Sequence, residues 1–423
     1  MVEGNSHKYK FALLRNFGVE SLTKYLKKQI PDFSKSLRLQ SVSKSHEKMC
    51  NVLNEKLELG LDDSSIEGTL FQILVYMQPD KSYYLTLKTD LNINDAMQQL
   101  SKKYSRIVNR KITENTNDEG SLVSIRREQN RLIFLFKEGI ARLGVEEERC
   151  YFYVSCIIDF DRQNIEIKLS EHKRRSAGIK LKYVLNKVEK FLKDNLTFST
   201  ATESFYLVPQ RDGEARIHKA LYQLFAKETA SSLDLIKGKI AELEGEKDPE
   251  LAEEELKKNV RKYLEEELHL SDSEPYVNKV LSSKYQDTVK LMSEADFIND
   301  GGFVFGFTFV DRRITKSTNK NEQNKPVYYS KIYWDLKETV KDYEEICDLG
   351  VYWKFNSVDC TRSVQETKDI EELSFAEVGL KEIHNVLEIH YYFNKDDDKD
   401  FLSCLRERRA REKYVIRKIR EVI

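Results

Sequence analysis

The sequence predicts an α+β fold, in which antiparallel strands and amphipathic helices follow one another along the chain. The first observation is that apolar and polar residues alternate over Tyr151–Lys168, which is typical of a half-buried β-hairpin. The second is that apolar residues recur at helical spacing over 176–196. The third is a new set of strand-like runs after Gly301. The expected order is an N-terminal antiparallel sheet with covering helices, a helical middle, and a second, C-terminal β-rich domain closed by a basic helix.

The chain has 423 residues, which is longer than one ordinary domain. We expect an N-terminal helix and antiparallel-sheet domain over residues 1–210 and a helical segment over 211–298. A C-terminal β-rich domain with a terminal basic helix should follow over 299–423. Only 16 glycines and 6 prolines are present, which favours long elements and short connections.

The composition limits the possible classes of protein. The 70 basic and 71 acidic residues leave a net charge of −1, so partners have to be inferred from local charge clusters. The six cysteines form no C-x₂-C pair, which argues against a disulfide framework and a structural zinc site. The seven histidines show no H-x₃-H or HExxH spacing, so no histidine metal site is expected. No apolar stretch approaches the ~20 residues of a membrane span, and we expect a cytoplasmic protein without membrane contact.

The elements of the first domain are predicted from local patterns. Residues 1–60 carry apolar stripes at helical spacing. A short helix is expected to start after Asn92 or Asn94, since either residue can cap it. Runs rich in aliphatic, β-branched and aromatic residues predict strands at Leu70–Met77, Tyr83–Lys88, Leu122–Ile125 and Leu132–Phe136. In the C-terminal region the same signal predicts strands at Phe303–Val310, Val327–Trp334, Val351–Phe355 and Val386–Phe393.

The hairpin over Tyr151–Lys168 can be assigned a register. A turn at Arg162–Gln163 would pair Phe160 with Ile165 and Asp159 with Glu166, so that the apolar residues of both strands share one face. The helix at 176–196, with Ser176 as a candidate cap, would then cover that apolar face.

Asp159, Glu166 and Lys168 lie together on the other face of this predicted hairpin. The set resembles the site of PD-(D/E)xK nucleases, over the hairpin alone, with a shorter spacing and no proline before Asp159. The resemblance implies a Mg²⁺ ion held by Asp159 and Glu166, with Lys168 positioning or activating a water molecule. A solvated sheet face and a binding surface are the alternatives for the same residues.

Two basic clusters suggest contact with phosphates. Residues 171–193 hold 8 Lys or Arg and 2 Glu, and the candidate contacts are Lys173, Arg174, Arg175, Lys180 and Lys182. Tyr151 and Tyr153 on the hairpin's polar face are candidates for stacking on bases. The C-terminal helix over 401–423 offers Arg406, Arg408, Arg409 and Arg411 on an outward basic face, and arginine favours bidentate phosphate binding.

A third charged segment is acidic. Residues 242–267 hold 11 Asp or Glu against 5 Lys or Arg. Such a segment is either a solvated helix face or a docking surface for protein partners or for self-association.

Together these patterns predict a cytosolic, non-catalytic protein that associates with nucleic acid, DNA rather than RNA, as a subunit of a larger assembly in prokaryotic or phage genome maintenance or defence. One alternative is a Mg²⁺-dependent nuclease that uses Asp159, Glu166 and Lys168. The other is a protein-interaction scaffold or inhibitor. No cofactor is expected except Mg²⁺ under the nuclease alternative.

Overall fold

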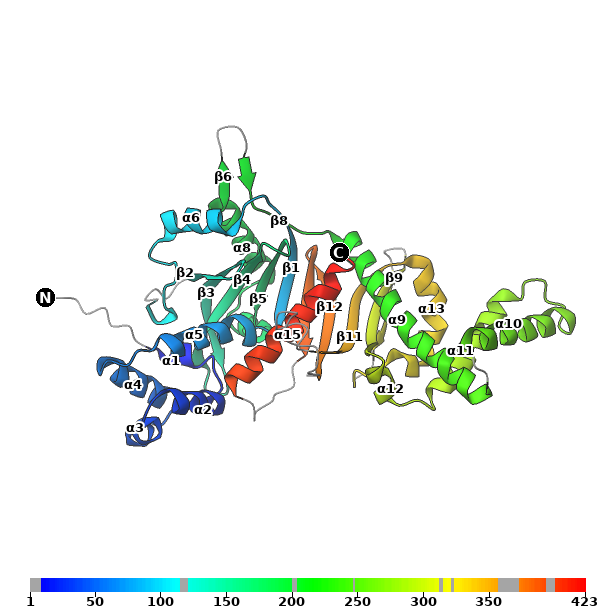
Figure 1. The fold of residues 1–423 in the computed structure, drawn as a ribbon, viewed down its shortest axis with the longest axis horizontal. Helices are drawn as coiled ribbons and strands as arrows, with labels where there is room; N and C mark the ends of the chain where they lie inside the picture. Colours follow the sequence, from blue (N-terminus) through cyan, green and yellow to red (C-terminus); the bar gives the residue numbers. More distant parts are fainter. Residues whose placement is uncertain are drawn as a thin grey trace. The chain divides into compact units, whose positions relative to one another are not determined.

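The computed structural model describes residues 9–114, 121–199, 204–245, 248–311, 315–320, 323–356, 373–392 and 400–423. It divides into two compact units. Unit 1 comprises Met1–Asp212 and Val386–Ala410, and unit 2 comprises Gly213–Asn385 and Arg411–Ile423. Both units combine helices with antiparallel strands, so the predicted α+β fold is confirmed (Figure 1).

Most of the first residues of unit 1 are helical, as predicted. The helices are α1 (Phe11–Leu14), α2 (Val19–Gln29), α3 (Phe33–Leu39), α4 (Ser45–Glu58), α5 (Ser64–Gln72), α6 (Ile93–Tyr104), α7 (Glu171–Ser176) and α8 (Leu181–Asn195). Asn92 caps α6, and its side chain accepts hydrogen bonds from the backbone N–H groups of Asn94 and Asp95. The helix predicted over 176–196 is present as α8 but begins later, at Leu181. The prediction that Ser176 caps it is wrong, because Ser176 is the last residue of α7 and Lys180 is at the N-cap of α8.

The strand predicted at Leu70–Met77 is wrong. This segment contains the end of α5 and a π-helical turn, η1 (Ile73–Met77). Leu70, Phe71 and the first four residues of η1 are all buried. A short run that is apolar on every side has no helical stripe, and periodicity alone cannot distinguish it from a buried strand.

The strands of unit 1 form an antiparallel sheet in the order β13-β1-β5-β4-β3-β2, with β8 also paired to β1. Their bounds are β1 (Lys81–Lys88), β2 (Ser121–Glu128), β3 (Arg131–Leu143), β4 (Glu148–Asp159), β5 (Asn164–Leu169), β8 (Val208–Gln210) and β13 (Val386–Tyr392). A separate hairpin joins β6 (Thr197–Ser199) to β7 (Ser204–Tyr206). The strands predicted at Tyr83–Lys88, Leu122–Ile125 and Leu132–Phe136 are confirmed.

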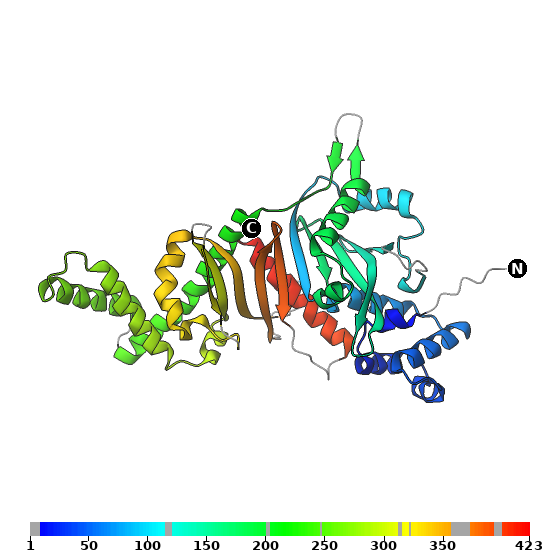
Figure 2. The same ribbon diagram turned by 180° about the vertical axis from the view of Figure 1, so that it is seen from behind.

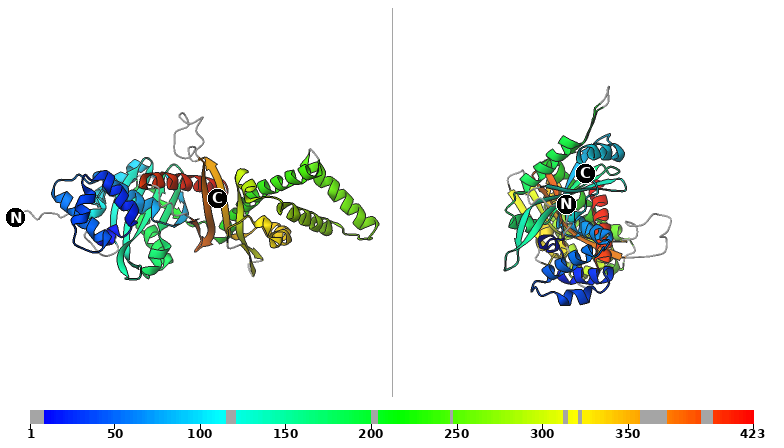
Figure 3. Two further views of the ribbon diagram at one scale, coloured as in Figure 1. Left: turned by 90° about the horizontal axis from the view of Figure 1, so that it is seen from below. Right: turned by 90° about the vertical axis from the view of Figure 1, so that its left-hand side faces the viewer.

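Each face of this sheet is covered by helices. On one face, Phe191 of α8 packs edge-on against Phe134 and Phe136 of β3, with ring centroids 5.8 and 5.2 Å apart, so α8 covers the apolar face as predicted. The other face joins Tyr151, Tyr153 and Ile157 of β4 to the core formed by α1–α5 and by Phe401 and Leu405 of α15 (Phe401–Arg420). Figure 3 shows α15 and α8 on opposite sides of the unit 1 strands.

Unit 2 combines helices with a second set of antiparallel strands. Its helices are α9 (Glu214–Glu244), α10 (Pro249–Glu266), α11 (Glu274–Val289), α12 (Glu294–Asn299) and α13 (Lys331–Tyr343). Its strands follow the order β10-β9-β11-β12, with bounds β9 (Gly302–Asp311), β10 (Thr315–Lys320), β11 (Ile346–Asn356) and β12 (Leu373–Ile383). Helix α9 lies along these strands, in front of them in Figure 1 and behind them in Figure 2, and Phe225 contacts Phe307 at 4.9 Å between centroids.

The strands predicted at Phe303–Val310, Val351–Phe355 and, up to Tyr392, Val386–Phe393 are confirmed; Phe393 lies outside the described residues. The strand predicted at Val327–Trp334 is wrong, because a 3₁₀ turn (Val327–Tyr329) and the start of α13 occupy it. Its aromatic residues form a compact cluster. The rings of Tyr328 and Tyr333 meet edge-to-face at 5.1 Å, and Trp334 Nε1 donates to the Tyr328 carbonyl at 2.8 Å.

Candidate functional site

The hairpin of β4 and β5 is present with a register that differs from the predicted one. Asp159 lies opposite Asn164, and Ile157 lies opposite Glu166, so the prediction that Asp159 faces Glu166 is wrong. The connecting loop, 160–163, is two residues longer than expected, and Asp159 Oδ1 stabilises it by accepting a hydrogen bond from the Arg162 N–H at 2.9 Å. Because the shift is two residues, each side chain keeps the predicted face.

Asp159, Glu166 and Lys168 therefore share one sheet face, but this face is not solvated. Asp159 is 4% exposed and Lys168 is 1% exposed. Asp159 Oδ2 pairs with Arg131 Nε at 2.8 Å and with Arg162 Nη1 at 3.8 Å, and Glu166 Oε2 accepts from Ser82 at 3.2 Å. Two guanidinium groups therefore pair with the carboxylate that the nuclease hypothesis assigns to Mg²⁺. The alternative of a solvated sheet face is wrong, because Asp159 and Lys168 are buried.

The same network continues under η1. Lys168 Nζ lies 4.9 Å from the ring centroid of Tyr76, and the Tyr76 hydroxyl donates to Glu128 at 2.9 Å. Glu128 also pairs with Arg409 of α15 at 2.8 Å, and the Arg409 guanidinium lies 4.8 Å from the same ring. π-Helical turns are frequent at functional positions, and here the turn presents one buried tyrosine to three charged residues.

Burial and charge set the protonation of this network. Burial, followed by the charge of Glu128, raises the pKa of the Tyr76 hydroxyl well above its usual value, so the group remains a donor. For Arg131, burial lowers the pKa, but the carboxylates of Asp159 and Glu166 outweigh it and the net pKa is raised. These directions keep Arg131 charged and Tyr76 neutral, which is the pattern of a stabilising ion network.

The first basic cluster is divided between the interior and the surface. Lys173 is 8% exposed, and its ammonium donates to Asn16 Oδ1 at 2.6 Å and to Gln78 Oε1 at 2.7 Å. Arg174 is half-buried and pairs with Glu171 at 2.7 Å. Arg175 also pairs with Glu171, but it is exposed, as are Lys180 and Lys182. Tyr151 and Tyr153 are buried in the unit 1 core, so the prediction that they are available for stacking on bases is wrong.

The exposed face of α8 carries the surface part of this cluster. Lys182, Lys190 and Lys193 are exposed and are spaced at i, i+8 and i+11, which places them on one face of a helix with 3.6 residues per turn. Tyr183 is 58% exposed and lies beside this row, seven residues before Lys190. We call Lys182, Tyr183, Lys190 and Lys193 the α8 basic stripe.

Helix α6 adds positive charge next to the end of α8. Tyr104 donates to Asn195 Oδ1 at 2.9 Å, and Lys103 Nζ also donates to Asn195. Lys102 and Arg106 at this end of α6 are exposed. Two helices far apart in sequence therefore bring lysines and an arginine to the same part of unit 1. Sequence patterns alone do not reveal this proximity.

The four arginines predicted on the C-terminal helix also divide. Arg408 Nη2 donates to the Met77 carbonyl at 2.7 Å, and Arg409 belongs to the Glu128 network, so both turn toward unit 1. Arg411 is half-buried in the part of α15 that belongs to unit 2, and Arg406 is exposed. The expected outward basic face is therefore incomplete.

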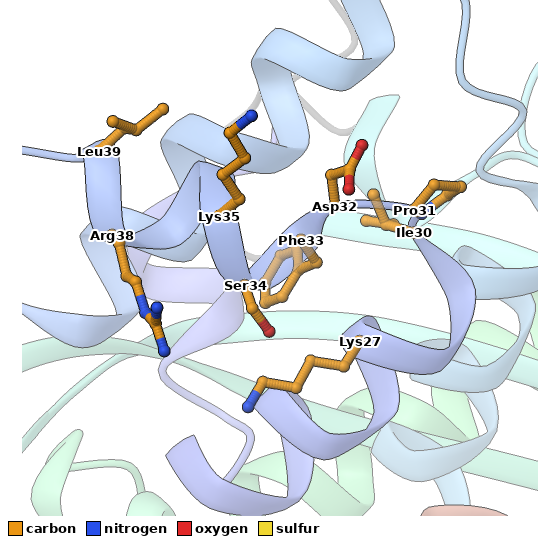
Figure 4. Close-up of a pocket in the computed structure, with 9 residues that line it drawn as sticks. All are labelled: Lys27, Ile30, Pro31, Asp32, Phe33, Ser34, Lys35, Arg38 and Leu39. Carbon is orange, nitrogen blue, oxygen red and sulfur yellow. The ribbon is translucent and has the colours of Figure 1, made fainter.

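A shallow hollow of about 550 Å³ lies at the turn between α2 and α3. In the view of Figure 4, the side chains of Lys27, Ser34 and Arg38 point to one side, and Lys35 points to the other. The sequence gives no signal for this hollow, because Lys27 is separated from Ser34 and Arg38 along the chain and the turn at Asp32 brings the three to one place.

The acidic segment forms α10 and its flanks. Glu253 is engaged by Lys237, Lys257 and the Tyr285 hydroxyl at 2.7 to 2.8 Å, and although burial opposes it, these partners lower the pKa of Glu253 to about 2. Other carboxylates are exposed beside Leu251 and Tyr263, two large apolar side chains that are also exposed.

No protein-family model matches the chain, and the searches of curated proteins and of solved structures return no match. Among the described residues, no helix combines the length and apolar character needed to cross a bilayer.

Proposed function

We propose that this protein is a cytosolic, non-catalytic nucleic-acid-binding protein that contacts phosphates through the α8 basic stripe. The observation that supports this function is that three exposed lysines and one exposed tyrosine share one outward helix face. Lysines neutralise phosphates, and an exposed aromatic ring can stack on an unpaired base. Arg175 and Lys180 are exposed cations that precede α8 in the chain and widen the candidate surface. Arg406 is exposed on α15, on the opposite side of the unit 1 strands from α8 (Figure 3), so it would make a separate contact.

The buried hairpin network fits a structural role within this proposal. Asp159 is held by two arginines, and Lys168 lies under the Tyr76 ring. A Mg²⁺ ion needs open oxygen ligands, and recruiting Asp159 would require these ion pairs to break. The nuclease alternative remains a prediction that the binding experiment also tests.

The experiment measures the affinity for a fluorescent DNA duplex at several salt concentrations. We expect log Kobs to fall linearly with log salt, and we expect the slope to shrink by about 3 in the variant Lys182→Gln/Lys190→Gln/Lys193→Gln, since each lost phosphate contact removes about 0.9. The matched control is Lys258→Gln/Lys262→Gln/Lys279→Gln, which neutralises three exposed lysines of α10 and α11. This control should keep the wild-type slope.

Two results would contradict the proposal. One is a salt slope that is the same in the wild type and in the α8 variant. The other is cleavage of plasmid DNA in Mg²⁺ or Mn²⁺ that is lost in Glu166→Ala, because that result would make the hairpin catalytic.

The acidic α10 is the element that we propose contacts a protein partner in a larger assembly. Exposed Leu251 and Tyr263 lie among carboxylates there, and such a surface suits a partner that is both basic and apolar.

A further inference from the structure

A buried histidine of unit 2 lies next to two carboxylates. Glu214 and His218 belong to the first turns of α9, and Glu382 lies near the end of β12. One potential ligand atom from each of these residues lies within 4.8 Å of the others. Helix α9 contacts β12 directly, so the packing of unit 2 itself brings the three side chains together.

His218 is the unusual member of this group. It is 3% exposed, and within the described part of the chain its Nε2 atom has no hydrogen-bond partner. A buried polar atom without a partner is costly, and such atoms in folded proteins often mark a missing water molecule or ion. Neutral imidazole is the form of histidine that coordinates metals, and carboxylates are the other ligands that this cluster offers.

The two carboxylates have oxygen atoms available. Glu382 Oε1 accepts the backbone N–H of Asn385 at 2.8 Å, and within the described residues no hydrogen bond is found for its second oxygen. Glu214 is exposed, and no hydrogen bond or ion pair of its side chain is found among the described residues. An incoming ion would therefore meet Glu214 at the surface and the imidazole beneath it.

We propose that Glu214, His218 and Glu382 form a binding site for a divalent transition-metal ion, with Zn²⁺ as its best match. Zinc accepts imidazole nitrogen and carboxylate oxygen at about 2.0–2.2 Å, which puts tetrahedral ligand atoms roughly 3.3 Å apart. The ligand atoms lie within 4.8 Å of one another, so the set has to close by at most about 1.5 Å, a shift of the size that rotation of side chains such as the exposed Glu214 allows. Imidazole favours zinc over Mg²⁺ and Ca²⁺, which prefer oxygen ligands alone.

Three protein ligands leave one coordination position for water or for a ligand from solution. Glu214 and His218 are spaced at i and i+4, so they lie on one face of α9, and Glu382 completes the set from a strand. The ion would tie the start of α9 to the end of β12 within unit 2. This site has no signature in the sequence, because it contains a single histidine and its third ligand is distant in sequence.

The test is calorimetric titration of the full chain with Zn²⁺ after removal of bound metal by a chelator. We expect one Zn²⁺ per chain in the wild type. Glu214→Gln and Glu382→Gln preserve side-chain size and should each weaken binding at least about tenfold, since even the loss of an outer-shell partner costs about 10- to 100-fold. His218→Gln should abolish binding at this site. The matched controls are Glu242→Gln, an exposed carboxylate at the far end of α9, and His269→Gln, an exposed histidine; both should bind as the wild type does.

A Co²⁺ titration locates the ion independently of folding effects. Cobalt at this site should give visible absorption bands without a thiolate charge-transfer band, because no cysteine is among the ligands. The proposal is overturned if the wild type binds no Zn²⁺, or if it binds Zn²⁺ with an affinity that neither glutamate substitution changes. It is equally overturned if a thiolate band accompanies cobalt binding. Because none of these residues belongs to the α8 basic stripe, the outcome is independent of nucleic-acid binding.

Discussion

Lys173 lies in a run of basic residues but is a structural residue of unit 1. Its ammonium donates to Asn16 and Gln78, and burial lowers its pKa. In Lys173→Met, the side-chain oxygens of Asn16 and Gln78 lose their hydrogen-bond donor, so we expect the free energy of unfolding to fall by about 1–3 kcal/mol. Chemical denaturation followed by far-UV circular dichroism measures this loss. The exposed Lys180→Met is the control and should remain within about 0.5 kcal/mol of the wild type.

The stability difference between the wild type and Lys173→Met should also depend on pH. Because the pKa of Lys173 is lower in the folded chain than in the unfolded chain, the unfolded chain binds more protons between these two pKa values. The contribution of Lys173 to stability therefore rises with pH until the pH passes the unfolded value of about 10.4. The stability difference between the wild type and Lys173→Met should grow from neutral to alkaline pH. A difference that is flat or that shrinks with pH would contradict the assignment.

At the scale of the element, the π-helical turn η1 connects the sheet to α15 within unit 1. Tyr76→Phe removes the hydrogen bond to Glu128 but keeps the ring, so we expect a loss of about 1.5–3 kcal/mol in the free energy of unfolding. Tyr76→Leu should cost more, because it also removes the contacts of Lys168 and Arg409 with the ring, each worth about 0.5–2 kcal/mol. Urea denaturation measures both losses, and Tyr183→Phe is the control at an exposed tyrosine. Equal losses in Tyr76→Phe and Tyr76→Leu would show that the ring contacts with Lys168 and Arg409 do not stabilise the fold.

Strands and helices with a clear period were predicted from the sequence, as β4 and α8 illustrate. The errors have physical causes. All of Leu70–Met77 except Gln72 and Met77 is buried, so the segment lacks the one-sided pattern that distinguishes helix from strand. The hairpin register depended on a loop that Asp159 stabilises through the Arg162 N–H, a contact that alternation does not encode.

The candidate site was less predictable than the fold. A basic run in the sequence gives the total charge but not whether each side chain points to the interior or to solvent. In the structure Lys173, Arg408 and Arg409 have partners inside unit 1, whereas Lys182 is exposed. The cluster of Glu214, His218 and Glu382 depends on the packing of a helix against a strand that is distant in sequence. Such convergence of separate elements is invisible to local patterns.

At the scale of the whole molecule, both units use residues from the end of the described chain. Both tryptophans, Trp334 and Trp353, belong to unit 2, so tryptophan fluorescence reports that unit. Deleting residues 411–423 removes Tyr414, whose ring stacks on Phe355 at 4.3 Å and lies 5.9 Å from Trp353. In this truncated chain we expect a changed tryptophan fluorescence spectrum. Amide exchange in β1 should be unchanged, because its partner β13 is retained.

Deleting residues 386–423 should give a further effect in unit 1. β1 then loses β13, its partner from Lys81 to Tyr84, and we expect amide exchange there to accelerate at least about tenfold. Hydrogen-exchange mass spectrometry compares the two truncations. Equal exchange of β1 in both would show that β13 does not stabilise this strand.

The assignment of Val386–Ala410 to unit 1 also has a consequence for synthesis of the chain. Residues 213–385, which separate the two parts of unit 1, must be translated before β13 reaches β1. At about 5–20 residues per second the ribosome needs roughly 9–35 s for that interval. During this time the backbone of Lys81–Tyr84 in β1 lacks its β13 partner, and the core surface that packs on Phe401 and Leu405 is uncovered, a state prone to aggregation. Unit 1 is therefore expected to finish folding late and to depend on chaperones while it emerges.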